Sequence, residues 1–209
     1  MSNSSESSSG TAPYRSAQGL LPESRYLATA GSNFVLEIHD VVTGTLLATS
    51  GEVPLVASFS PMENLVGWAT VGGEAGVLDI AALARGVNLE EATIFEQEAH
   101  QGQIHGIALD GNRRLATAGT ADALVRIWDI DSGDLLLEFP SGRDGTSSSY
   151  LAFAPDGGHL TYSDRVGLIR RFPLDVDSLF DLAKQRLTRD MTRDECIQYL
   201  DPATCPDEG

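Results

Sequence analysis

Short runs of apolar and β-branched residues alternate with turn-forming residues along most of the chain. The runs are rich in Ile, Val, Leu, Phe and Thr, and no helical periodicity is visible before residue 176. Four turns contain Pro, Asp, Asn or Gly, which preset or tolerate turn dihedral angles: PESR at residue 22, PMEN at 61, DGNR at 110 and PDGG at 155. This spacing predicts antiparallel strands separated by tight turns.

Two segments of the chain have nearly the same sequence. LATAGSNFVLEIHDVVTG occupies residues 27–44, and LATAGTADALVRIWDIDSG occupies residues 115–133. The copies begin 88 residues apart, which is twice 44, and degraded copies occupy residues 57–80 and 151–175. This period predicts four repeats of one structural unit. In the best repeat we expect four strands, near 103–109, 114–119, 124–129 and 134–139.

A four-stranded unit of about 40 to 45 residues that ends a strand in Trp-Asp resembles the repeat of the WD-repeat β-propeller family. The third unit carries the resemblance, with the sequence AHQGQIHGIALDGNRRLATAGTADALVRIWD at residues 99–129. It implies a structural chain of hydrogen bonds inside one blade, from Trp128 through Thr117 and His100 to Asp122. The residue types fit, because an indole only donates, a hydroxyl and an imidazole relay, and a carboxylate only accepts.

The other units depart from this pattern at the Trp position. His39, Leu78 and Phe172 stand where those units would carry Trp, and in the third unit Ala99 replaces the Gly that usually precedes the histidine. The resemblance as a whole covers about residues 14–206. We therefore expect the full hydrogen-bonded network only in the third blade, with the other blades held together by packing.

The expected fold is all-β, a propeller arc of about four four-stranded antiparallel blades followed by a short helical tail. The Ser-rich N-terminus has no apolar run and is expected to be disordered. The fourth unit runs through Pro173 into a helical pattern, so it lacks an outer strand and the chain resembles the C-terminal part of a longer propeller. The expected boundaries are 1–13 for the N-terminus, about 14–50, 51–98, 99–142 and 143–175 for the blades, and 176–209 for the tail.

The tail predicts two amphipathic helices. The first lies near residues 176–187, and the second opens with Thr192 and Glu195 at capping-box spacing. We expect these helices to cover the last blade, where Arg171 replaces the apolar residue that should precede the Trp position. The segment 173–206 also resembles the ending of large actinobacterial signalling and regulatory NTPase proteins, which implies the sensor end of a bacterial protein. The phosphate loop and kinase signatures of such proteins are absent from this sequence.

The net charge and the cysteine content exclude several kinds of ligand and site. The formal net charge of -16 repels nucleic-acid phosphates and anionic lipid headgroups, so direct binding to nucleic acid or membrane is not expected. Cys196 and Cys205 are the only cysteines and lack the spacing of a zinc site. We expect free or partly buried thiols in a cytoplasmic protein, in preference to a disulfide or a metal site.

Three groups of residues could have a catalytic or binding role, although each also has a structural interpretation. His100, His105, Thr117 and Asp122 could form a hydrolase relay, but no nucleophile elbow or oxyanion-hole motif accompanies them. The carboxylates of residues 129–134 are similar to a calcium loop, but they lie where turn chemistry requires Asp and Gly. The acidic run 88–100 could dock a basic partner, although a solvated loop that enters an outer strand accounts for it.

These interpretations favour a non-catalytic scaffold or sensor module that binds protein partners, and the acidity of the chain favours basic ones. We expect no catalytic residue, no cofactor and no metal. Self-association through an open propeller edge is a further expectation, because an incomplete ring exposes apolar faces. The alternative is a propeller that binds a ligand or hydrolyses a substrate at an unrecognised site, because the fold hosts both kinds of function.

Overall fold

Each of the four repeats forms one antiparallel sheet in the computed structural model, which describes residues 18–20, 25–30, 36–49, 56–141, 148–164 and 167–186. The strands of each sheet pair in chain order, and we call the sheets the first to fourth blades. The first blade contains β1 (Gln18–Leu20), β2 (Tyr26–Ala30), β3 (Leu36–Asp40) and β4 (Thr45–Thr49). The second contains β5 (Val56–Phe59), β6 (Leu65–Ala69), β7 (Glu74–Asp79) and β8 (Thr93–Glu98). The third contains β9 (Ile104–Leu109), β10 (Arg114–Gly119), β11 (Leu124–Asp129) and β12 (Leu135–Pro140), and the fourth contains β13 (Ser148–Phe153), β14 (His159–Asp164) and β15 (Ile169–Pro173).

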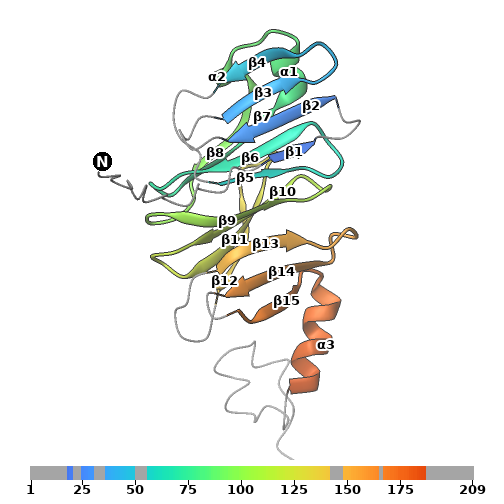
Figure 1. Cartoon of the computed structure of the whole chain (residues 1–209). Coiled ribbons are helices and arrows are strands. Elements are labelled where there is room, and N and C mark those ends of the chain that lie inside the picture. The colour runs from blue at the N-terminus through green and yellow to red at the C-terminus, as the bar shows by residue number, and fades with distance from the viewer. Residues whose placement is uncertain are drawn as a thin grey trace, which may run out of the picture. The chain divides into compact units, whose positions relative to one another are not determined.

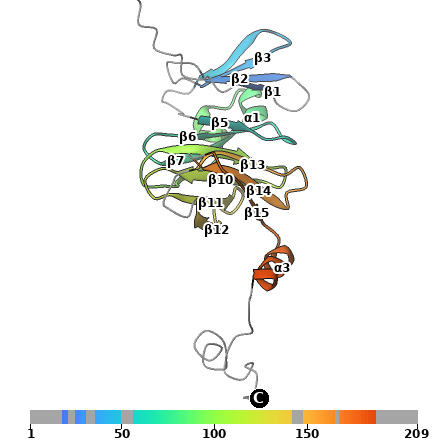
Figure 2. The same cartoon turned by 60° about the horizontal axis from the view of Figure 1, so that its bottom comes forward.

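The blades follow one another in chain order within the unit formed by residues 1–172 (Figures 1 and 2). The first strands of the blades are neighbours, since β1 lies beside β5, β5 beside β9 and β9 beside β13. This arrangement is a partial β-propeller and confirms the predicted all-β fold class. Among the described residues the fourth blade has three strands, in keeping with the expected lack of an outer strand.

Asp side chains fix several of the turns. In the third blade, Asp110 Oδ1 accepts the N–H groups of Asn112 and Arg114 at 2.9 and 2.8 Å. Asp129, the Asp of the Trp-Asp pair, accepts those of Asp131 and Ser132 at 2.9 and 2.8 Å. These bonds hold the chain in Asx turns, so the four strands of the third blade begin and end within one residue of the predicted bounds.

The same Asp recurs in the first blade for the same reason. Asp40 Oδ1 accepts the N–H groups of Val42 and Thr43 at 2.9 and 3.1 Å, directly after β3. These backbone groups, that of Thr43 above all, hold the pKa of Asp40 below its usual value despite some desolvation. Both repeated segments therefore have an Asp at this position, Asp40 and Asp129, because its carboxylate closes the turn between the third and fourth strands.

Two short helices were not predicted. Helices α1 (Ile80–Ala84) and α2 (Leu89–Ala92) lie between β7 and β8, where the sequence showed no helical periodicity. Asp79 Oδ1 caps α1 by accepting the N–H of Ala82 at 3.0 Å, and Asn88 Oδ1 caps α2 by accepting the N–H of Glu91 at 2.8 Å. These helices show no periodicity in the sequence, because helices of five and four residues are too short to show a period.

A β-bulge marks the Trp position in the first three blades. The register between the third and fourth strands shifts at Ile38/His39, at Val77/Leu78 and at Ile127/Trp128. On the second strand, His39 lies opposite Leu27 and Trp128 lies opposite Leu115. The three blades therefore have the same register, and His39, Leu78 and Trp128 are equivalent positions.

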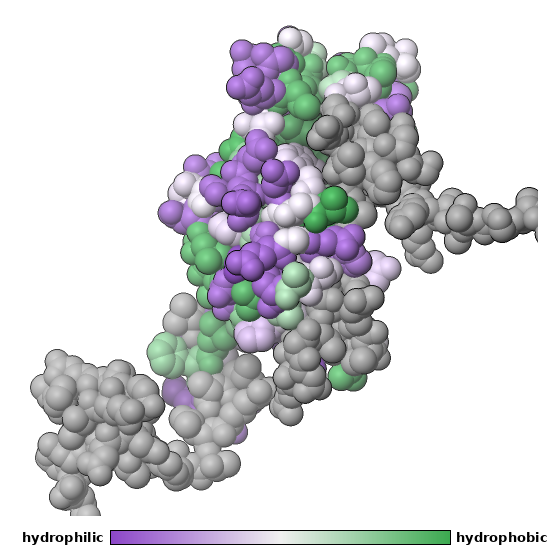
Figure 3. All heavy atoms as spheres, turned by 90° about the vertical axis from the view of Figure 1, so that its left-hand side faces the viewer, coloured by the Kyte–Doolittle hydropathy of each residue, from purple (hydrophilic) through white to green (hydrophobic). Residues whose placement is uncertain are grey.

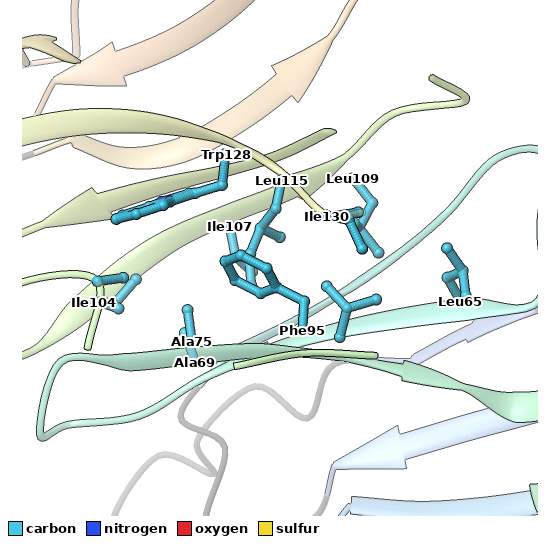
Figure 4. Packing of buried hydrophobic residues seen from close by; sticks show 12 residues of the cluster. Leu65, Ala69, Ala75, Phe95, Ile104, Ile107, Leu109, Leu115, Trp128 and Ile130 are labelled. Carbon is cyan, nitrogen blue, oxygen red and sulfur yellow. The ribbon is translucent and has the colours of Figure 1, made fainter. Parts of the chain in front are cut away.

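Successive blades pack face to face. We call the side of a blade toward the preceding blade its leading face and the opposite side its trailing face. In the third blade the leading face carries Leu115, Thr117 and Trp128, because Leu115 and Trp128 share a buried cluster with Val77 and Phe95 of the second blade (Figure 4). The alternation of side chains along strands assigns the intervening residues to the trailing face.

The residue at the Trp position rests on the outer strand of the preceding blade. Trp128 lies 6.1 Å from Phe95 of β8 between ring centroids, and Phe172 stacks on Phe139 of β12 at 4.0 Å with an interplanar angle of 7°. Leu78 packs in a cluster with Leu47 of β4. This position thus needs a large apolar side chain but not a Trp, which is why Leu and Phe replace it.

Arginines on one turn bridge three blades. Arg113 Nη1 donates to Glu63 Oε2 in the turn of the second blade at 2.9 Å, and Arg113 Nε donates to Asp131 Oδ1 at 2.7 Å. Arg114 Nη2 donates to the carbonyl of Gly157 in the turn of the fourth blade at 2.6 Å. The turn between β9 and β10 therefore links both neighbouring blades.

The second unit, residues 173–209, is described as far as helix α3 (Val176–Arg186), which corresponds to the first predicted tail helix (Figure 1). The second predicted helix, Cys196, Cys205 and the Ser-rich residues 1–13 lie outside the described residues. The covering of the last blade by the tail stays a prediction. In the part of the chain that the structure describes, none of the helices has the length and hydropathy needed to cross a membrane.

Trp68 and Gly76 give a test of the packing between the first two blades. Trp68 lies opposite Gly76, and a Cβ at Gly76 would stand 2.3 Å from Trp68 Cζ2. We expect Gly76→Ala to lower the free energy of unfolding by about 1 to 3 kcal/mol, because the indole must move within a packed cluster. Urea unfolding measures the effect. Gly72→Ala is the control, since its Cβ would meet only Thr70 Oγ1 at 3.5 Å; equal midpoints for the two variants would contradict the packing described.

Candidate functional site

The four polar residues predicted to form a network come from four parts of the third blade. His100 lies in the segment before β9, Thr117 in the middle of β10, and Trp128 near the end of β11. Asp122 lies in the turn between β10 and β11. His100, Thr117 and Trp128 are buried, and Asp122 is partly buried.

The side chains of these residues form a continuous chain of hydrogen bonds. Trp128 Nε1 lies 3.0 Å from Thr117 Oγ1, and Thr117 Oγ1 lies 2.8 Å from His100 Nε2. His100 Nδ1 lies 2.8 Å from Asp122 Oδ2. The chain ties the second and third strands of the blade to the segment that enters the first strand.

Donor and acceptor rules assign the direction of every bond. The Asp122 carboxylate only accepts, so His100 carries its proton on Nδ1 and donates it there. In the neutral imidazole, which burial favours, His100 Nε2 is the acceptor, and the Thr117 hydroxyl donates to it while accepting the indole N–H of Trp128. Every donor has an acceptor, and the histidine is the neutral Nδ1–H tautomer.

The pKa values agree with a neutral histidine beside an ionised aspartate. Burial lowers the pKa of His100 below its ordinary value, against the opposing influence of the Asp122 carboxylate. Partial burial acts to raise the pKa of Asp122, but the hydrogen bond from His100, the Leu124 N–H and the charge of Arg126 hold it below its usual value. Both directions favour a neutral imidazole beside an ionised carboxylate.

Arg126 is a member of this site that the sequence analysis missed. Its Nη1 donates to Asp122 Oδ2 at 3.1 Å and to the carbonyl of Ala99, and its Nε donates to Glu138 Oε2 at 2.7 Å. The guanidinium joins the Asp122 end of the network to the outer strand β12. The available signal was its spacing, four residues after Asp122 and two before Trp128 on the same strand.

The geometry of the network is not that of a hydrolase relay. The Thr117 hydroxyl is fully buried and already donates to His100, so it is not presented to a substrate. His105 lies on β9, at another position of the same blade. What the arrangement does chemically is satisfy buried polar groups, which would otherwise cost free energy.

The carboxylates of Asp129 and Asp131, within residues 129–134, take part in turn and ion-pair contacts. Asp129 accepts the two backbone N–H groups described above, and Asp131 pairs with Arg113 at 2.7 Å. Among the described residues, no group of three or more His, Cys, Asp or Glu side chains could hold a metal ion.

The other blades fill the corresponding positions differently. In the second blade the register places Trp68 where the third blade has Thr117, and Gly76 where it has Arg126. In the first blade His39 Nε2 lies 3.2 Å from Glu37 Oε2 on the same strand.

The chain resembles curated proteins over only a small part of their length. No family model matches it. It is 29% identical to Autophagy-related protein 18 of Meyerozyma guilliermondii over 108 residues, which are 51% of this chain and 19% of that protein. It is 37% identical to SVP1-like protein 2 of Schizosaccharomyces pombe over 60 residues, which are 28% of this chain and 16% of that protein. The chain thus spans less than a fifth of these curated relatives.

Two solved structures share the fold. The computationally designed Ika4 protein matches with a TM-score of 0.58 at 18% identity, over 72% of this chain and 86% of that one. A chain of a mitotic checkpoint complex matches with a TM-score of 0.61 at 17% identity, over 75% of this chain and 46% of that one. Such low identities show the fold alone. The relatives named are fungal and lend no support to the actinobacterial resemblance of the tail, which stays a prediction. The comparisons agree, at the level of fold and weak sequence likeness, with a chain similar to WD-repeat propeller proteins.

The network predicts two destabilising substitutions. Trp128→Ala should lower the free energy of unfolding by about 3 to 5 kcal/mol, because it leaves a cavity against Phe95 and frees the Thr117 hydroxyl. His100→Ala should cost about 1 to 3 kcal/mol, because Thr117 and Asp122 lose their partner. Urea unfolding monitored by circular dichroism measures both; wild-type stability in both variants would remove the network as a stabilising element.

The neutral state of His100 predicts a loss of stability in mild acid. Its pKa is lower in the folded protein than the ordinary value of 6.5, so the unfolded chain binds more protons as the pH falls below that value. We expect the free energy of unfolding to fall by about 1 kcal/mol between pH 7.5 and 5.5. Asp122 adds to the loss only at lower pH, since its pKa lies below 3.8. His100→Gln should flatten the dependence while His39→Gln keeps it; equal slopes in both variants would contradict the assignment.

Proposed function

We propose that the chain is a non-catalytic protein-interaction module whose blades present a fixed, acidic surface to a basic protein segment. The observation that carries the proposal is a concentration of exposed carboxylates along β8 and the turn that follows β11. Glu96 and Glu98 are exposed on β8, and Asp131 and Asp134 are exposed in the turn. Coulombic attraction over such a surface favours basic partners and speeds their association.

The two acidic segments belong to neighbouring blades. A Cβ at Gly133 would stand 3.5 Å from Gln97 Nε2, so the turn of the third blade lies against the face of β8 that carries Gln97, while Glu96 and Glu98 alternate with Gln97 toward the other face of the strand. Figure 3 shows hydrophilic residues over much of the visible middle of the molecule. The surface lies on packed strands and a closed turn, which gives a partner a preformed shape.

The acidic surface contains an unfavourable pair that a basic partner would relieve. Glu74 and Glu98 lie directly opposite each other on β7 and β8, both exposed. Like charges at opposed positions of a sheet destabilise it. A Lys or Arg of a partner placed between them removes this repulsion, so part of the binding free energy comes from the strain of the free surface.

The absence of catalysis rests on the polar groups of the third blade. The His, Thr and Asp that could form a relay are committed to one another and to Trp128 inside the blade. The names of the two curated relatives, Autophagy-related protein 18 and SVP1-like protein 2, do not identify a reaction. The ligand-binding or hydrolase alternative gains no specific support from the described residues. The sensor function in a signalling protein and the cytoplasmic location rest on the sequence and remain part of this proposal.

Fluorescence polarisation with labelled peptides tests the interaction. A Lys- and Arg-rich 15-residue peptide should bind the full chain saturably and weaken as salt rises, whereas an acidic peptide of the same length should not bind. Glu98→Lys should weaken binding several-fold and slightly raise stability, because it also removes the repulsion from Glu74. Asp181→Lys in α3 is the matched control for charge and should bind like the wild type.

Two results would overturn the proposal. One is equal binding by Glu98→Lys and Asp181→Lys, which would show that net charge and not this surface attracts the peptide. The other is turnover of a generic ester, phosphate or peptide substrate that is lost on mutating Asp122 or His105, which would establish an enzyme.

A further inference from the structure

The trailing face of the fourth blade exposes positions that are buried in the blades before it. Counted from the Trp position, Ile169 corresponds to Val125 in the third blade and Ala75 in the second. Ile169 is 76% exposed, whereas Val125 and Ala75 are fully buried. Tyr150 of the same blade is 70% exposed. Apolar side chains of this size at an inter-blade position are typical of a surface that another surface covers.

Polar residues stand beside these apolar ones. Arg171 occupies the position directly before Phe172, where the first three blades carry the buried residues Ile38, Val77 and Ile127. The exposed guanidinium lies 3.0 Å from His159 Nδ1. The trailing face of the fourth blade is therefore partly apolar and basic.

The leading face of the first blade has the opposite charge. Glu37 and His39 lie on it, with side chains 42% and 31% exposed and 3.2 Å apart. Their equivalents in the third blade are Arg126 and Trp128, the second of which is buried against the preceding blade. The acidic group and the reduced apolar content distinguish this face from the leading faces of the later blades.

We propose that two copies of the chain associate head to tail, with the trailing face of the fourth blade of each copy against the leading face of the first blade of the other. At the junction of the second and third blades, Val77 shares a cluster with Trp128 of the next blade. At the junction between copies, Arg171 occupies the position of Val77, and His39 occupies the position of Trp128. The junction therefore brings the Arg171 guanidinium to His39 and its neighbour Glu37. Ile169 and Tyr150 pack beside this ion pair.

A second copy fits because it satisfies both ends at once. Two copies joined in this way bring eight of the described blades together, within the range of propellers, and each described terminal face is covered by the other copy. Head-to-tail contacts close into a ring when the rotation permits and otherwise continue as a filament.

Charge-exchange variants of the full chain test this contact. Size-exclusion chromatography with light scattering should give a dimer mass for the wild type at 100 μM or less, as an order-of-magnitude limit for a specific contact. Glu37→Arg and Arg171→Glu should each shift the protein to monomer by raising the dimer dissociation constant at least about tenfold, because like charges then meet at both junctions. A mixture of the two variants should recover the dimer, since one junction keeps the native pair and the other carries the exchanged pair. Glu90→Arg and Arg85→Glu, both at exposed positions, are the controls and should leave the mass unchanged, with folding of all variants checked by circular dichroism.

The remaining outcomes overturn the proposal. A monomeric wild type would show that the faces are covered within one chain, for example by residues 173–209. A dimer that both charge variants retain would place the contact on another surface. Two monomeric variants whose mixture stays monomeric would exclude the pairing of Glu37 with Arg171.

Discussion

The packing of one blade against the outer strand of the blade before it is the interaction on which the rest of this structure depends. A sheet between two others has to bury both of its faces, and alternating side chains make each strand contribute to both. The third blade meets this requirement on its leading face with Leu115 and Trp128 against Phe95, and on its trailing face with Phe139 against Phe172. The β-bulge at the Trp position recurs because it aims that side chain at the preceding blade.

The hydrogen-bonded chain of the third blade is a consequence of this burial. A blade covered on both sides cannot leave His100 or Thr117 in contact with water, so their polar atoms need partners inside the protein. The order Trp, Thr, His and Asp supplies one donor for each acceptor, and Arg126 neutralises the carboxylate at its end. The second blade avoids the requirement by placing Trp68 over Gly76. Both solutions leave recognition to the surface and not to the buried polar groups.

Several parts of this arrangement were predictable from the sequence because they depend on local chemistry. Asp110 and Asp129 close turns through their own neighbours, so the strands of the third blade could be placed to within one residue. The contribution of Arg126 depends on the side chains of Asp122 and Glu138, which come together only in the folded blade. Helices α1 and α2 were missed because helices of five and four residues are too short to show a helical period, and their stability comes from packing on the first two blades. The acidity of β8 was visible, but its contact with the turn of the third blade is tertiary.

We expect the third blade, which is covered on both faces and whose buried polar groups are hydrogen-bonded, to be the most stable part of the molecule. Native-state hydrogen exchange followed by mass spectrometry at the lowest workable protein concentration tests it directly. Peptides from β10 should exchange most slowly, with an opening free energy close to that of global unfolding. Peptides from β2 and β14, in the two terminal blades, should exchange faster. Exchange of β10 as fast as that of β2 or β14 would contradict this account.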